Sequence, residues 1–71
     1  MELIAVFRAR NQTLIFANLL RSYGVKVLVV NTPRRLSVSC GLSAKFPAES
    51  RALAEEILSR RKFDSFAGIF N

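Results

Sequence analysis

The sequence contains a single cysteine, Cys40, and no histidine. A cysteine–histidine pair is therefore excluded, and with it the activation of the thiol seen in cysteine proteases. One cysteine and five carboxylates give too few ligands in useful spacings for a zinc or iron site, so no metal and no cofactor is expected. The glycines stand at positions 24, 41 and 68 and form no phosphate-binding loop. What remains is the chemistry of one thiol, which can carry a group covalently, exchange with a disulfide, or only pack.

Cys40 lies in the stretch "RRLSVSCGLSAKF", in which every second residue from Leu36 to Phe46 is apolar. A period of two is typical of a strand and predicts one over residues 36–45. In phase with its apolar neighbours, the cysteine could simply be buried, as cysteines often are. The functional alternative rests on Gly41, which would let a substrate or partner backbone come close, and on Ser39, which can donate a hydrogen bond.

The rest of the chain predicts the elements around this strand. Further strands are expected over residues 2–8, 25–31 and 65–70, and helices over 10–23 and 48–61. Asn11 is expected to cap the first helix and Gly24 to end it, with Pro47 at the first turn of the second helix. The apolar face of the first helix should contain Thr13, Phe16, Ala17, Leu20 and Tyr23. The order βαββαβ predicts an α+β, ferredoxin-like sandwich: a four-stranded antiparallel sheet with two helices on one face and strands one and three in the centre.

This topology would gather positive charge where the first strand ends. The start of the first helix, the turn into the third strand and the end of the second helix all lie there. The basic residues expected at this end are Arg8, Arg10, Arg34, Arg35, Arg60, Arg61 and Lys62. Arginines and the free N–H groups of the helix start would lower the pKa of the Cys40 thiol and favour its reactive thiolate.

Composition sets the class of protein. Residues 1–71 make one domain, and a single cysteine cannot form an internal disulfide, so a reducing cytoplasm is expected. No stretch approaches the apolar length of a membrane span, and no membrane association is expected. Ile15 and Leu19 lie on the flank of the first helix and, with the high apolar content, suggest a homodimer.

A net charge of +6 points to an anionic partner. Nucleic acid is one rival, although RNA-binding sandwiches stack bases on exposed aromatic side chains of their central strands. The aromatic side chains available here, Phe7 and Phe46, occupy positions expected in the core. Nucleic acid is therefore not the partner that the sequence favours.

The stretch "NTPRRLSVSCGLSAKF" resembles the signature of the selenium/sulfur carrier-like family, in which a proline and a basic residue precede Ser-Cys-Gly. The matching residues are Pro33, Arg34, Ser39, Cys40 and Gly41. The resemblance extends over nearly the whole chain. It implies a ferredoxin-like fold, and it implies that Cys40 is the site of a persulfide or selenopersulfide.

We therefore predict a small cytoplasmic carrier that is not an enzyme with turnover of its own. Cys40 would accept a sulfane sulfur or selenium atom from a donor such as a cysteine desulfurase and pass it to an acceptor protein. Arg34 and Arg35 would steer the donor and stabilise the anion, together with Arg8 and Arg10. The alternatives are a non-catalytic interaction or regulatory module whose cysteine only packs, and a nucleic-acid-binding module.

Overall fold

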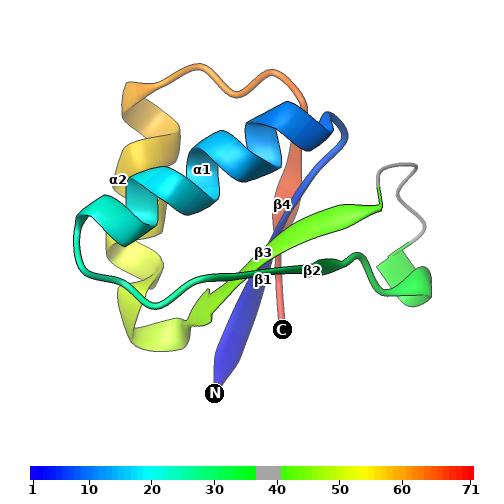
Figure 1. The fold of residues 1–71 in the computed structure, drawn as a ribbon, viewed down its shortest axis with the longest axis horizontal. Coiled ribbons are helices and arrows are strands. Elements are labelled where there is room, and N and C mark those ends of the chain that lie inside the picture. The colour runs from blue at the N-terminus through cyan, green and yellow to red at the C-terminus, as the bar shows by residue number, and fades with distance from the viewer. Residues whose placement is uncertain (37–40) are drawn as a thin grey trace.

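A computed structural model describes residues 1–36 and 41–71 of the chain. The elements in chain order are β1 (Glu2–Phe7), α1 (Arg10–Ser22), β2 (Leu28–Asn31), the 3₁₀ turn η1 (Arg34–Leu36), β3 (Leu42–Pro47), the 3₁₀ turn η2 (Ala48–Ser50), α2 (Arg51–Arg60) and β4 (Phe66–Phe70). The strands form one antiparallel sheet in the order β2-β3-β1-β4 (Figure 1). The predicted α+β, ferredoxin-like βαββαβ arrangement is confirmed, with β1 and β3 in the centre.

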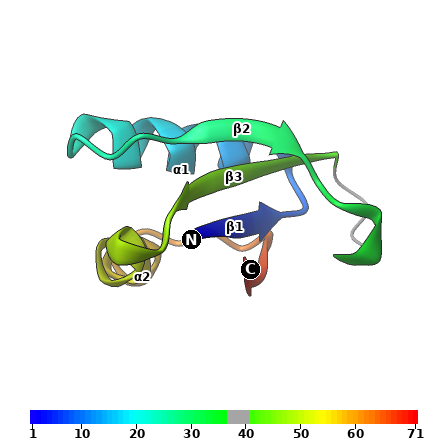
Figure 2. The same cartoon turned by 90° about the horizontal axis from the view of Figure 1, so that it is seen from below.

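Both helices cover the same face of the sheet, as Figure 2 shows from below. Between the layers lies a cluster of phenylalanine rings centred on Phe7, whose ring lies 5.1 Å from that of Phe16 and 5.4 Å from those of Phe63 and Phe66. Phe46 of β3 joins this cluster through Phe16. The fully buried rings of Phe7 and Phe46 are core residues, as the sequence predicted.

The buried face of α1 consists of Thr13, Phe16, Ala17 and Leu20, as expected from helical spacing. The prediction for Tyr23 is wrong, because this residue is the C-cap and is 58% exposed. The prediction that Asn11 caps the helix is also wrong: Ala9 is the N-cap and makes no side-chain hydrogen bond.

Gly24 ends α1 in the left-handed region, with φ of 84°, as predicted. Its N–H donates to the carbonyl of Arg21, and the N–H of Val25 donates to the carbonyl of Leu20. The Arg21 side chain then donates from Nε and Nη2 to the carbonyl of Val27. These contacts bind residues 25–27 to the helix end, and β2 consequently begins at Leu28 instead of residue 25.

The third strand also starts later than the period of two predicted. Leu36 belongs to η1, in which its N–H donates to the carbonyl of Pro33, and β3 begins at Leu42. Residues 37–40 lie outside the described part of the chain. The reason for the late start is the partner strand: β2 pairs with β3 from Asn31 opposite Leu42, and Pro33 has no N–H to extend the ladder.

The second helix is divided at its start. Pro47 is the last residue of β3 and leads into η2, and regular α-helix begins only at Arg51. From there α2 buries Ala54 and Ile57 against the sheet. The helix runs to Arg60, close to the predicted end at residue 61.

Candidate functional site

The predicted site centres on Cys40, which with Ser39 lies outside the described residues. The structure does describe both flanks of this segment, Leu36 on one side and Gly41 on the other. The N–H of Thr32 donates to the carbonyl of Gly41 over 2.8 Å. Thr32 and Gly41, which stand before and after η1 and the segment of Cys40 in the sequence, are therefore held together where β2 ends and β3 begins.

The start of β3 lies against the first turn of α1. Thr13 Oγ1, which is fully buried, donates to the carbonyl of Leu42 over 3.3 Å. Because Ala9 gives no side-chain cap, the N–H groups at the beginning of α1 receive no side-chain acceptor from the N-cap. The helix start and the residues that follow the cysteine in the sequence are thus brought together, as the topology predicted.

Arg8 and Arg10 flank this helix start, and both are exposed. The main-chain N–H of Arg8 donates to the carbonyl of Ser65 over 2.8 Å, which ties the end of β1 to the connection between α2 and β4. Their side chains are therefore available to an anion that approaches the beginning of α1.

Gln12 holds the same connection from the helix side. Its Nε2 donates to Asp64 Oδ1 over 2.6 Å, and its Oε1 accepts from both the N–H and the hydroxyl of Ser65. This contact could not be predicted from the sequence, since Gln12 and Asp64 are far apart in the chain and match no motif.

Arg34 and Arg35 lie in η1, and both are exposed. Arg35 Nη2 donates to the main-chain oxygen of Asn71 over 2.7 Å. Asn71 follows Phe70, which pairs with Ile4 near the start of β1, whereas Arg8 follows the end of that strand. Arg8 and Arg10 therefore lie at the end of β1, whereas the guanidinium of Arg35 binds near the start of that strand.

Gly41 is exposed and has free space beside it. A Cβ built on this residue would meet no atom within 4 Å. A side chain at this position would consequently project from the surface at the start of β3, where the sequence predicted that a partner could approach.

In residues 1–36 and 41–71, no three potential metal ligands come together. No helix in this part of the chain is long and apolar enough to cross a membrane. Burial of Phe7 and Phe46 removes the aromatic side chains on which an RNA-binding sandwich would stack bases.

Comparison with known proteins gives one family. The model of a family described as "Putative Se/S carrier protein-like" matches residues 2–68, which is nearly the whole chain. No curated protein and no solved structure matches.

Proposed function

The chain belongs to the Se/S carrier protein-like family, and we propose that it holds a sulfane sulfur or selenium atom on Cys40 and transfers it to a partner protein. The observation that carries this proposal is the family match combined with the cysteine count. A persulfide carrier needs a thiol, and this chain has one cysteine. If the carrier role holds, Cys40 is the residue that performs it.

The loading step is an exchange at sulfur. The Cys40 thiolate attacks the terminal sulfur of a persulfide on the donor enzyme, the bond between the two donor sulfurs breaks, and the donor cysteine leaves as a thiolate. Cys40 then bears the persulfide, and the same exchange with an acceptor thiol returns it to the free thiolate. A selenium atom in the terminal position would follow the same path, and neither step consumes an oxidant or a reductant.

The surroundings of the flanking residues support this role. The chain enters β3 directly after Gly41, beside the first turn of α1, whose start is flanked by the exposed Arg8 and Arg10. A helix N-terminus and nearby arginines stabilise a thiolate or a persulfide anion. The open space beside Gly41 would admit the cysteine of a donor or acceptor protein.

Loading from a cysteine desulfurase tests the proposal directly. After incubation with the enzyme and free cysteine, the intact wild-type chain should gain the mass of one sulfur atom, and a reductant should remove it. The Cys40→Ser variant should keep its fold and gain nothing. An unloaded wild-type chain, with the desulfurase shown to be active, would contradict the proposal.

The pH dependence of alkylation tests the reactivity of the thiol. If the helix start and the arginines lower the pKa of Cys40, alkylation of the native protein should reach its midpoint at a lower pH than that of a free cysteine. Replacing Arg8 and Arg10 with alanine should raise the midpoint, because both are exposed beside the start of α1. High salt should raise it more weakly, because it screens exposed charges.

A cysteine that only packs would give the reverse pattern. Alkylation would then be slow across neutral and mildly alkaline pH until the protein unfolds, and the arginine replacements would not change it. Serine in place of Cys40 would lower the free energy of unfolding, since it would bury a hydroxyl group. That pattern would favour the non-catalytic interaction module.

A further inference from the structure

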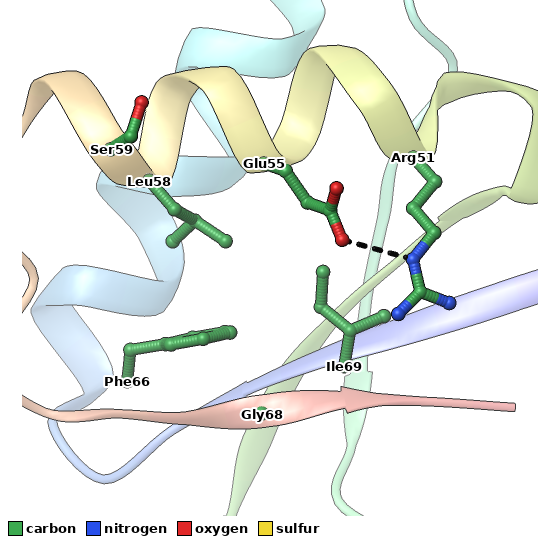
Figure 3. A pocket seen from close by; sticks show the side chains of 7 residues that line it. All are labelled: Arg51, Glu55, Leu58, Ser59, Phe66, Gly68 and Ile69. Atoms are coloured by element: carbon green, nitrogen blue, oxygen red, sulfur yellow. Dashed lines mark hydrogen bonds and ion pairs between the residues drawn. The ribbon is translucent and has the colours of Figure 1, made fainter.

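A groove of about 450 Å³ lies between α2 and β4 (Figure 3). Leu58 of α2 and Phe66 of β4 face each other at one end of it, and both are half-buried. Ile69 rises from β4 toward α2 at the other end, close to the ion pair of Arg51 and Glu55. The groove thus has an apolar floor and a charged group at one end.

One wall of the groove is an edge strand. Within the described residues β4 pairs with β1 and with no other strand, so one side of its backbone has no partner strand. A bulge at Ala67 interrupts the pairing, since Phe7 lies opposite Phe66 and Val6 opposite Gly68, and regular pairing resumes from Gly68 to Phe70. An edge strand beside a helix is the setting in which proteins add an extended peptide as a further strand.

Arg51 supplies positive charge at one end of the groove. Its Nε donates to Glu55 Oε2 over 3.1 Å, and no residue in the described part of the chain accepts from its two Nη groups. These donors are suited to a carboxylate bound through both of its oxygens. The net charge of +6 also favours an acidic partner over a second copy of the same chain.

We propose that the groove between α2 and β4 binds an extended acidic segment of a partner protein, which adds to β4 as a fifth strand. An apolar side chain of the segment would rest on Leu58 and Phe66, and a carboxylate on the same face would pair with Arg51. Seven residues of helix rise about 10 Å between Arg51 and Leu58. An extended chain covers this distance in about three residues, so the two anchors would stand roughly two to four residues apart.

Binding of a peptide in this groove does not require sulfur transfer. The groove lies at the β4 edge, and β1 and β3 separate it from β2. Peptide binding can be measured on the reduced, unloaded protein, and therefore its failure would leave the loading experiment on Cys40 unaffected.

The probe is an acetylated, amidated hexapeptide. It has valine in the first position, glutamate in the third and fifth, and threonine in the second, fourth and sixth. Its valine and glutamates share one face of an extended strand. Titration into the isotope-labelled full chain should shift the amide signals of residues 51–59 and 66–70 and slow hydrogen exchange in β4. A peptide with lysine in place of glutamate should bind at least about tenfold more weakly, and backbone N-methylation should abolish binding.

Two variants of the ion pair should move the affinity in opposite directions. Arg51→Gln should weaken binding about fivefold or more, because the carboxylate loses its charged donor. Glu55→Gln should strengthen it, since Glu55 competes with the peptide for the same guanidinium. Arg60→Gln is the matched control. Arg60 also pairs with a glutamate four residues away on α2, Glu56, but it does not line the groove. The Arg60→Gln variant should therefore bind the peptide with the affinity of the wild type.

Three results would overturn the proposal. One is the absence of amide shifts in the groove at millimolar peptide. Another is a change of affinity in the same direction in the Arg51 and Glu55 variants, which would indicate a general effect on the helix. The third is a change of the amide signals of groove residues when the protein alone, without peptide, is concentrated. This result would assign the surface to a second copy of the chain.

Discussion

Gly41 and Gly68 differ sharply in what a side chain at their positions would meet. At Gly41 a Cβ would stand in open space. At Gly68 the backbone adopts φ of 139°, which side chains rarely permit, and a Cβ would lie 3.0 Å from the ring of Phe70. Sequence alone could not separate them, because both stand within predicted strands.

Alanine at each position should therefore have different effects. Gly68→Ala should lower the free energy of unfolding by about 1–3 kcal/mol, from backbone strain and the contact with Phe70. Gly41→Ala should change it by less than about 0.5 kcal/mol. Urea denaturation followed by circular dichroism measures both values. Equal destabilisation would show that Gly41 is constrained in a way that free space beside it does not explain.

At the scale of elements, the order and type of the helices and strands could be predicted from hydrophobic periodicity. The end of α1 could also be predicted, since Gly24 was available as a left-handed stop. The beginnings of β2 and β3 could not, because tertiary contacts set them. β2 begins later in the sequence because Val25 and Val27 are hydrogen-bonded to the end of α1. β3 begins later because its partner strand β2 is short, although the alternation of apolar residues continues back to Leu36.

The candidate site could be predicted only in part. The approach of β3 to the start of α1 follows from topology, and the contact of Thr13 with Leu42 agrees with it. The position of the Arg35 guanidinium does not follow from topology, because a long side chain selects its own acceptor, here the main-chain oxygen of Asn71. The groove beside α2 was not foreseen, since its walls come from distant parts of the sequence that share no motif.

Thr13 joins two elements, and its removal should be measurable. Thr13→Val keeps the shape of the buried side chain but loses the hydrogen bond to the carbonyl of Leu42, and should lower the free energy of unfolding by about 1 kcal/mol. Ser22→Ala is the control, since its exposed hydroxyl donates only within α1, to Leu19. If thermal denaturation finds the two variants equally stable, the contact does not hold β3 to the helix.

At the scale of the whole molecule, the core depends on few large side chains. Phe7 contacts rings from α1, from the connection after α2 and from β4, and it is fully buried. Surface apolar residues remain as well: Leu14, Ile15 and Leu28 are 43%, 39% and 51% exposed. The homodimer expected through Ile15 and Leu19 stays a prediction, which sedimentation at several concentrations would check.

Truncation of Phe7 should bring the domain close to unfolding. Phe7→Ala should cost about 3–5 kcal/mol through lost contacts and a cavity, against a total stability of about 4–10 kcal/mol for a chain of this length. Leu14→Ala, at an exposed position, should cost less than about 1 kcal/mol. Chemical denaturation gives both differences, and a small loss in the Phe7 variant would mean that the ring cluster repacks around the gap.

The pairing of β1 with β4 also has a kinetic consequence. Ile4 lies opposite Phe70, so this pair of strands closes a loop that spans almost the entire chain. The entropy of that closure must be lost before the strands gain their hydrogen bonds and ring contacts, which slows folding in proteins dominated by distant pairings. The helices can form from neighbouring residues, whereas β4 can dock only on a strand made at the other end of the chain. We therefore expect refolding in milliseconds or longer, limited by the search of one terminal strand for the other.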